Sequence, residues 1–168
     1  MTFEVIDNFI SDYHFKSLTN TLLGDKFPWY FNDHVVDRRD GRYQFTHGLQ
    51  STKGLSPYPD QEEFSDYYPL VLPILQELKA TRVFRVKANL NPKTFFHRRS
   101  QYHIDIASPE MKTAIFYMNT CNGWTKFKKG GRVKSVANRV VTFHHKVEHA
   151  GVTCTDEPRR VVINLNYV

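Results

Sequence analysis

Cysteine and long apolar runs are both scarce in this chain. Its 168 residues include only two cysteines, Cys121 and Cys154, which cannot build a disulfide framework and do not have the spacing of a zinc knuckle. No apolar run approaches the length of a membrane span. The first residues, MTFEVIDNF, lack the basic and apolar regions of a signal peptide. We therefore expect a soluble cytoplasmic protein that has no membrane contact and keeps its thiols reduced.

Internal repeats, linkers and low-complexity tracts are also absent. Hydrophobic residues make up 40% of the chain and charged residues 24%, which is ordinary for a globular protein and excludes a disordered tail or a collagen-like fibre. The length suits one domain with a sizeable core. We expect a single domain over residues 1–168, in which residues 1–82 form an N-terminal support and residues 83–168 form the core.

The N-terminal support is predicted to contain two helices. A short apolar strand is expected from Phe3 to Ile6, and Asp7 or Ser11 offers a cap for the helix that follows it. Apolar residues recur at helical spacing in that helix, and again in a second helix from Tyr67 to Leu78. Pro73 is expected to kink the interior of this second helix, because proline lacks an amide hydrogen.

The core is predicted to be made of β-strands. Short segments rich in β-branched and aromatic residues are bounded there by Gly, Pro, Asn or Ser. The clearest of them cover residues 83–91, 112–120, 139–145 and 160–168, and shorter candidates cover residues 102–106 and 131–136. Several strands at this spacing predict a sandwich or barrel. The expected fold class is therefore mainly β (α+β), with the N-terminal helices packed on a sheet face.

Charge is divided unevenly along the chain. The first 84 residues carry 8 Lys and Arg against 12 Asp and Glu, whereas the last 84 carry 15 against 5, so the net charges of the halves are −4 and +10. The basic half is consistent with nucleic-acid binding, with an acidic substrate or with a solvated basic surface. It also allows a few cations to face inward and bind an anionic cosubstrate.

Three residues with metal-ligand side chains follow one another in the core. In the predicted strand over residues 102–106, alternation places His103 and Asp105 on the same face. His149 follows the strand predicted over residues 139–145. Two imidazoles and one carboxylate on one side of a metal leave three positions open, which is the facial triad of non-heme Fe(II) oxygenases. Zinc favours a tetrahedral site with fewer open positions.

Two adjacent arginines lead the last predicted strand. Alternation groups Arg160 with Val162, Asn164 and Asn166, and it directs Arg159 to the opposite face. A guanidinium on a strand beside a metal can bind a carboxylate bidentately. Arg160 is therefore the candidate anion clamp, and its neighbour Arg159 is left as an alternative.

Other polar residues carry weaker signals. Asn89 and Asn91, at a period of two in the strand before His103, are candidates to line the same pocket. His144 and His145 lie close upstream of the third candidate ligand and have no assigned role. The remaining histidines have no partner pattern and are interpreted as structural or exposed; they are His14, His34, His47 and His97.

The chain resembles the Fe(II)- and 2-oxoglutarate-dependent oxygenases, in particular the compact prolyl-hydroxylase-like branch of bacteria and phages. The likeness is carried by YHIDI, TAIFYMNTCNGWT, VKSVANRVVTF, VEHAG and RVVINLNYV, with FPWYFNDHVV nearer the N-terminus. It implies a double-stranded β-helix, or jelly roll, with His103, Asp105 and His149 as the ligands of Fe(II). It further implies that Arg160 pairs with the distal carboxylate of 2-oxoglutarate and that the phenol of Tyr117 reaches the same carboxylate.

The resemblance also implies an activity. Such an enzyme consumes 2-oxoglutarate and O2, hydroxylates a C–H bond of its substrate and releases succinate and CO2. A prolyl residue of a peptide or protein is the expected substrate. A nucleic acid or a free amino acid is the alternative on the same fold, and a non-enzymatic jelly-roll binding module is a further alternative. Residues 95–99 and 124–129, which interleave basic and aromatic side chains, are expected to be loops that contact the substrate.

Overall fold

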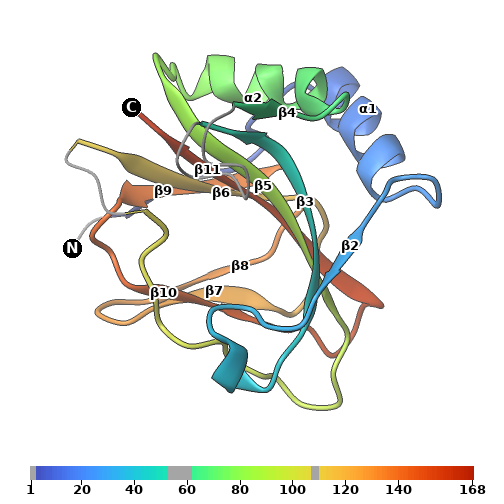
Figure 1. The fold of residues 1–168 in the computed structure, drawn as a ribbon, viewed down its shortest axis with the longest axis vertical. Coiled ribbons are helices and arrows are strands. Elements are labelled where there is room, and N and C mark those ends of the chain that lie inside the picture. Colours follow the sequence, from blue (N-terminus) through green and yellow to red (C-terminus); the bar gives the residue numbers. More distant parts are fainter. Residues whose placement is uncertain (1–2, 53–61, 107–109) are drawn as a thin grey trace.

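Two antiparallel β-sheets and a layer of helices make up the fold (Figure 1). The computed structural model describes residues 3–52, 62–106 and 110–168. Eight strands form the larger sheet, in the order β1–β9–β6–β11–β5–β3–β2 with β4 paired to β3, and the smaller sheet has the order β10–β7–β8. The strands of the larger sheet are β1 (Phe3–Ile6), β2 (Tyr30–Asn32), β3 (Gln44–Ser51), β4 (Glu63–Phe64), β5 (Val83–Pro92), β6 (Lys112–Tyr117), β9 (Arg139–His144) and β11 (Arg159–Tyr167). Those of the smaller sheet are β7 (Trp124–Phe127), β8 (Arg132–Lys134) and β10 (His149–Val152).

The two α-helices lie together on one face of the larger sheet, and the smaller sheet lies over the opposite face (Figure 1). The first helix, α1 (Asp12–Leu22), begins where predicted, because the side chain of Ser11 accepts a hydrogen bond from the amide of His14. A short 3₁₀ helix, η1 (Arg38–Asp40), precedes β3. No helix in the described part of the chain is long and apolar enough to cross a membrane.

The second predicted helix is divided in the structure. A 3₁₀ turn, η2 (Tyr68–Val71), leads into the short helix α2 (Leu72–Glu77). Pro69 and Pro73 each lie in the first turn of one of these two elements. An amide is not needed at that position, so proline is tolerated there, and a continuous helix with a kinked interior was the wrong expectation.

Strand alternation sorts the apolar side chains into two clusters. Phe116 of β6 and Leu18 of α1 belong to the cluster between the helices and the larger sheet. The neighbouring Ile115 of β6 and Phe127 of β7 belong to the cluster between the two sheets. Burying a side chain of this size contributes about 1.5–3 kcal/mol. The cluster between the sheets is smaller, because polar side chains replace apolar ones toward its open end.

The four longest predicted strands are present as β5, β6, β9 and β11, with ends that differ by one to three residues. Residues 102–106 are not a strand, because the backbone there forms only an isolated bridge between His103 and His149. Four strands, β3, β4, β7 and β10, were not predicted. β3 contains the buried polar residues Gln44, His47 and Gln50 and has an irregular register, so it lacks an alternating apolar pattern.

Candidate metal centre

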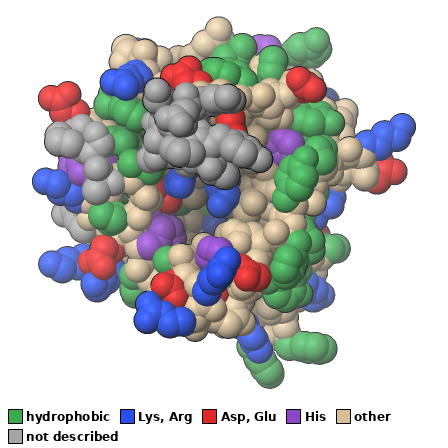
Figure 2. Space-filling model, viewed as in Figure 1, with side chains coloured by type: hydrophobic (Ala, Val, Ile, Leu, Met, Phe, Trp, Pro, Cys, Tyr) green, Lys and Arg blue, Asp and Glu red, His purple; other side chains and the backbone are tan. Residues whose placement is uncertain are grey.

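A polar cavity of about 310 Å³ opens between the two sheets. Figure 2 shows a hollow in this face of the molecule, with cationic and histidine side chains beside it. The walls come from β5 and β11 of the larger sheet, from β10 and Thr125 of the smaller one, and from the segments over residues 32–36 and 100–105. Asn89 and Asn91 line the cavity, as their spacing in β5 predicted, and Arg160 and Asn164 face it from β11.

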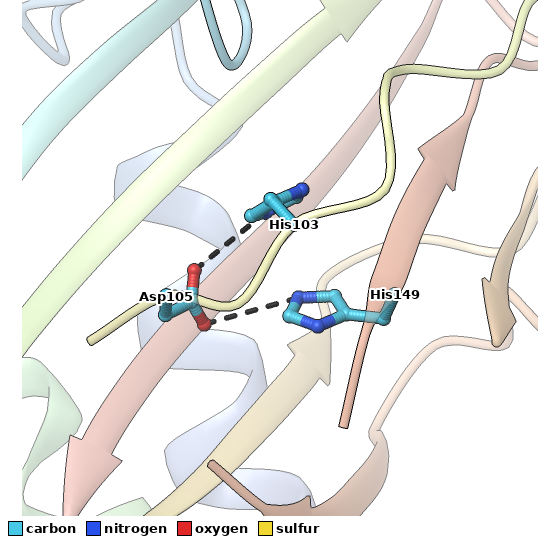
Figure 3. Close-up of side chains that lie close together, drawn as sticks. All are labelled: His103, Asp105 and His149. Atoms are coloured by element: carbon cyan, nitrogen blue, oxygen red, sulfur yellow. Dashed lines mark ion pairs between the residues drawn. The ribbon is translucent and has the colours of Figure 1, made fainter. Parts of the chain in front are cut away.

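His103, Asp105 and His149 come together at this cavity (Figure 3). One ligand atom of each residue lies within 4.8 Å of those of the other two. The Nε2 atoms of His103 and His149 lie 3.7 and 3.8 Å from the carboxylate oxygens of Asp105. The backbone holds the two histidines side by side, because the amide of each donates to the carbonyl oxygen of the other, both at 3.0 Å.

Both imidazole rings are oriented as metal ligands usually are. His103 Nδ1 lies 3.2 Å from the carbonyl oxygen of Gln101, and His149 Nδ1 lies 3.1 Å from that of Val147. When Nδ1 carries the proton and donates it to a carbonyl oxygen, Nε2 keeps the lone pair that can bind a metal. His149 Nε2 is buried and has no hydrogen-bond partner among the described residues. Burial also lowers the pKa of His149, which favours the neutral imidazole that binds metals. These three side chains therefore fit a bound cation.

The carboxylate of Asp105 is oriented by two neighbours. Its side chain is 5% exposed, and Nη2 of Arg85 lies 3.2 Å from one of its oxygens. Asn166 donates from Nδ2 to the other oxygen at 3.4 Å. Burial opposes ionisation, but the positive charge of Arg85 and the hydrogen bond from Asn166 favour the carboxylate, and the pKa of Asp105 lies below its ordinary value. The third ligand is therefore charged and fixed in place by the fold.

Arg160 lies buried in the cavity wall, with only 2% of its surface exposed. Its Nε donates to Ser135 Oγ at 2.8 Å, and its Nη2 donates to Thr125 Oγ1 at 3.1 Å. Within the described residues, no carboxylate forms an ion pair with it. Burial lowers the pKa of Arg160, yet a guanidinium stays protonated in proteins. An uncompensated positive charge therefore faces the cavity.

Of the two glycines beside Arg160, Gly123 is the one that allows the side chain to lie close to the backbone. A Cβ atom at Gly123 would lie 2.8 Å from Arg160 Cδ and 2.8 Å from the carbonyl oxygen of Val152. A Cβ atom at Gly151 would lie 3.6 Å from Arg160 Nη1. Gly123 is therefore packed closely against the arginine.

Tyr117 lies behind the cavity wall. Its buried hydroxyl donates to Thr125 Oγ1 at 2.8 Å, and the guanidinium of Arg160 lies 5.6 Å from its ring centroid. Thr125 lines the cavity and Tyr117 does not. Burial raises the pKa of Tyr117, so the phenol remains a hydrogen-bond donor. In this arrangement Thr125 stands between the phenol and a ligand of the cavity.

The neighbouring candidates Arg159, His144 and His145 lie outside the site. Arg159 donates from Nη2 to the carbonyl oxygen of Leu23, on the helix side of the sheet. His144 is exposed, and His145 is buried with its Nδ1 3.1 Å from a backbone carbonyl oxygen. None of these side chains lines the cavity.

Several residues at the site were not found from the sequence. Arg85 and Lys87 share the period of two that marks Asn89 and Asn91, so the pattern contained a signal for them. Thr125 and Ser135 carry no local signal. His34 was interpreted as structural or exposed, but it lines the cavity, with its Nδ1 2.6 Å from Asp33. The roles of Thr125 and Ser135 depend on contacts with Arg160, which is distant in the chain.

The two predicted substrate loops have different structures. In residues 95–99, Phe95 and Phe96 are 97% and 79% exposed. Residues 124–129 are mostly strand β7 rather than a loop, and Phe127 is buried in the cluster between the sheets. His97 of the first segment packs on Trp124 of the second, with ring centroids 4.6 Å apart.

A second group of potential ligands lacks the features of a metal site. Cys121, Cys154 and Asp156 have ligand atoms within 4.8 Å of one another. Burial raises the pKa of the Cys154 thiol to about 11, so the thiolate that a metal requires is disfavoured. The carboxylate of Asp156 is already occupied by the amides of Asn122 and Glu157.

Comparisons with known proteins identify this architecture. No protein-family model and no curated protein matches the sequence. A 2OG-Fe(II) oxygenase-family oxidoreductase from Burkholderia pseudomallei is 12% identical, with a TM-score of 0.70 over 98% of this chain and 84% of that one. This chain has the jelly-roll fold of the 2OG-Fe(II) oxygenases. The predicted fold class, a mainly β jelly roll with helices on one sheet face, is thereby confirmed.

Two prolyl hydroxylases share this 2OG-Fe(II) oxygenase fold with the chain. A Pseudomonas putida prolyl-4-hydroxylase is 18% identical, with a TM-score of 0.59 over 98% of this chain and 91% of that one. A Trichoplax adhaerens prolyl hydroxylase, in complex with a hypoxia inducible factor peptide fragment, is 14% identical. Its TM-score is 0.65 over 98% of this chain and 82% of that one. The His103, Asp105 and His149 cluster lies between the two sheets of this jelly roll.

Proposed function

We propose that this protein is an Fe(II)- and 2-oxoglutarate-dependent dioxygenase that hydroxylates a C–H bond of its substrate and releases succinate and CO2. The observation that carries the proposal is the guanidinium of Arg160, which is buried without a carboxylate partner among the described residues. It lies in the cavity that also holds His103, Asp105 and His149. A buried charge without a counter-charge is costly. A dicarboxylate that reaches both the metal ligands and Arg160 would satisfy both features.

His103, Asp105 and His149 would hold Fe(II) through two Nε2 atoms and one carboxylate oxygen. This donor set leaves positions open for the cosubstrate and O2. When bound, the metal and 2-oxoglutarate supply the activation of O2, which is chemistry of the cofactor rather than of the chain. The protein fixes the ligands in advance, through the carbonyl partners of the histidines and through Arg85 at Asp105.

Arg160 would bind the distal carboxylate of 2-oxoglutarate. Ser135 and Thr125 hold its Nε and Nη2, which leaves Nη1 directed to the ligand. The phenol of Tyr117 donates to Thr125 and so fixes the hydroxyl that borders the cavity. We assign Tyr117 to cosubstrate binding through this contact with Thr125.

The test is anaerobic visible absorption of the metal-free protein as Fe(II) and then 2-oxoglutarate are added. A broad charge-transfer band that needs both additions is expected, because 2-oxoglutarate would bind directly to the Fe(II).

Asp105→Ala should remove the band and the formation of succinate. Arg160→Ala should raise the 2-oxoglutarate concentration for half-saturation by about 10- to 100-fold, the loss of one charge-assisted contact. Arg159→Ala is the matched control and should behave as wild type.

Failure of this test would have a definite meaning. A folded protein that shows no band with Fe(II) and 2-oxoglutarate would overturn the dioxygenase proposal. The non-enzymatic jelly-roll binding module would then become the leading interpretation.

A prolyl residue of a peptide or protein is the substrate we propose. Two structural neighbours are prolyl hydroxylases, one of them in complex with a peptide fragment. Incubating the loaded enzyme with a library of proline-containing peptides should add one oxygen atom to proline, as seen by tandem mass spectrometry. Oxygen added to another residue, or to no peptide, would contradict this assignment.

Nucleic acid is the second candidate substrate. It is favoured by the exposed rings of Phe95 and Phe96 beside Arg98 and Arg99, since single strands bind to cationic surfaces with stacking rings. Filter binding to single-stranded DNA across a salt series is the test. Negligible binding at low salt would count against this candidate.

A further inference from the structure

A second cationic group faces the cavity from β5. Arg85 and Lys87 both line it, two residues apart on the same side of the strand. In the pairing of β5 with β11, Lys87 lies opposite Asn164, which is four residues from Arg160. Four residues of strand span about 13 Å. Lys87 and Arg160 therefore belong to different parts of the cavity.

Lys87 has no counter-charge of its own. Its ammonium forms no ion pair or side-chain hydrogen bond with any residue in the three described segments. Asp105 is the sole carboxylate among the described lining residues, and it is paired with Arg85 at 3.2 Å. A lysine at a protein surface usually keeps its charged ammonium group in bulk water. Lys87 is instead half-buried, and burial together with the charge of Arg85 lowers its pKa.

The charge balance of the loaded cavity leaves a positive excess. The described lining residues include three basic side chains, Arg85, Lys87 and Arg160, against the single carboxylate of Asp105. Fe(II) and the 2-oxoglutarate dianion would cancel each other. Two positive charges therefore remain uncompensated after loading, and such an excess attracts an anionic ligand and disfavours a cationic one.

An unpartnered acceptor lies beside the same lysine. Asn164 lines the cavity opposite Lys87, and its Oδ1 is buried with no hydrogen-bond partner among the described residues. Side chains opposite each other on paired strands are near neighbours. A buried acceptor without a donor is unfavourable, so a ligand with an N–H or O–H group next to its anionic group would suit this position.

We propose that Lys87 binds an anionic group, a carboxylate or a phosphate, of the molecule that the enzyme oxidises. The inference rests on the proposed function, which assigns the cosubstrate to Arg160 and leaves Lys87 to the substrate. Arg85 adds positive charge, but its guanidinium is engaged by Asp105 and Asn166. An acidic or phosphorylated flank next to the oxidised residue of a peptide has the required chemistry.

The test uses protein loaded with Zn(II), a redox-inert substitute for Fe(II), and saturated with 2-oxoglutarate. Inorganic phosphate, N-acetylglycine and the neutral N-acetylglycinamide are titrated in separately, and lysine side-chain signals are followed by ¹H–¹³C NMR. The signal of Lys87 is the one missing from Lys87→Met. Lys112, exposed at the start of β6 and outside the cavity lining, is the internal control.

Phosphate or N-acetylglycine should shift the Lys87 signal saturably, with no shift from the neutral amide and none at Lys112. Because neither variant has the Lys87 signal, anion binding to Lys87→Met and Lys87→Arg is measured by isothermal titration calorimetry. Lys87→Met should weaken the binding at least about tenfold, the loss of one charge-assisted contact, whereas Lys87→Arg should retain it. A response to phosphate alone identifies a phosphorylated substrate, and a response to N-acetylglycine identifies a carboxylate. No saturable shift with either anion would overturn the proposal.

Two further results separate this inference from the proposed function. If Lys87→Met raises the half-saturating 2-oxoglutarate concentration as much as Arg160→Ala does, Lys87 belongs to the cosubstrate site and the inference is wrong. If the Fe(II) charge-transfer band is absent while Lys87 still binds anions, the dioxygenase proposal fails together with the substrate assignment. A normal Fe(II) charge-transfer band without anion binding at Lys87 would overturn this inference and leave the dioxygenase proposal unchanged.

Discussion

Arg85 is the residue that most directly connects the fold to the proposed metal centre. Its guanidinium contacts both Asp105 and Asn166, and Asn166 in turn donates to Asp105. This triangle holds the carboxylate in one orientation. Since outer contacts of this kind commonly tune metal affinity, we regard Arg85 as a positioning residue rather than a ligand.

Replacing Arg85 should weaken metal binding without removing it. Arg85→Met is expected to lower Fe(II) affinity by about 10- to 100-fold, because Asp105 loses its oriented partner. Anaerobic Fe(II) titration at saturating 2-oxoglutarate, followed by the charge-transfer band, measures the effect. Lys87→Met removes a neighbouring cation without touching the carboxylate, so it should leave Fe(II) affinity close to wild type. Equal losses in both variants would contradict the positioning role.

Gly123 should matter for the cosubstrate more than for the metal. A methyl group there would meet Arg160 Cδ and the carbonyl oxygen of Val152, both at 2.8 Å. Gly123→Ala is therefore expected to raise the half-saturating 2-oxoglutarate concentration by at least about tenfold, because it displaces the guanidinium. Gly48→Ala, where a Cβ meets nothing within 4 Å, is the control. Unchanged 2-oxoglutarate binding in a folded Gly123→Ala would refute this view of the clamp.

At the level of elements, one asparagine adds to the pairing of β1 with β9 in holding the N-terminal segment to the jelly roll. The amide of Ile10 donates to Asn138 Oδ1 at 3.1 Å, and Asn138 Nδ2 donates to the carbonyl of Ile10 at 2.8 Å. Asn138 also adopts a left-handed backbone conformation, with φ of 58°, which asparagine tolerates better than most residues. One side chain thus sets both the turn before β9 and the approach to α1.

Asn138→Ala should destabilise the fold by about 2–4 kcal/mol, because it removes two buried hydrogen bonds and places alanine in a left-handed conformation. Urea denaturation followed by circular dichroism gives the free energy of unfolding. Asn138→Gly tolerates the positive φ, so it should lose only the hydrogen-bond contribution. A glycine variant no more stable than the alanine variant would show that the backbone conformation contributes nothing.

The elements that could be predicted were those with a local pattern. β5 alternates apolar and polar residues from Phe84 to Asn91, and β11 does so from Ile163 to Tyr167, so both their presence and their inward faces follow from neighbouring residues. β3 lacks this pattern, since Gln44, His47 and Gln50 are buried polar residues and its register shifts after Gly48. Only pairing with β5 on one side and β2 on the other makes it a strand.

For the whole molecule, the cavity links ligand binding to stability. It separates the two sheets and contains an excess of buried positive charge, so the empty protein carries an electrostatic cost that ligands would remove. Metal and 2-oxoglutarate should therefore stabilise the folded state beyond their local contacts with side chains.

Thermal unfolding measures this coupling. Zn(II) and 2-oxoglutarate, each at about 100 times its dissociation constant, should each stabilise the fold by about 2.7 kcal/mol, a rise in Tm of about 5–10 °C per ligand. Arg160→Ala should lose the increment from 2-oxoglutarate, because the clamp is missing, and keep the increment from Zn(II). Loss of both increments in this variant would mean that Arg160 acts on the metal site as well.

The sequence by itself determined the order of the candidate ligands, the inward face of β11 and the basic character of the core half. These are properties of neighbouring residues, since the period of two along a strand follows from backbone geometry alone. Tertiary structure decided which side chains meet. Arg160 bonds Ser135 and Thr125, 25 and 35 residues away, and Asp105 meets Asn166 at a separation of 61. Such contacts depend on the register of strands that are distant in the chain, which no local pattern specifies.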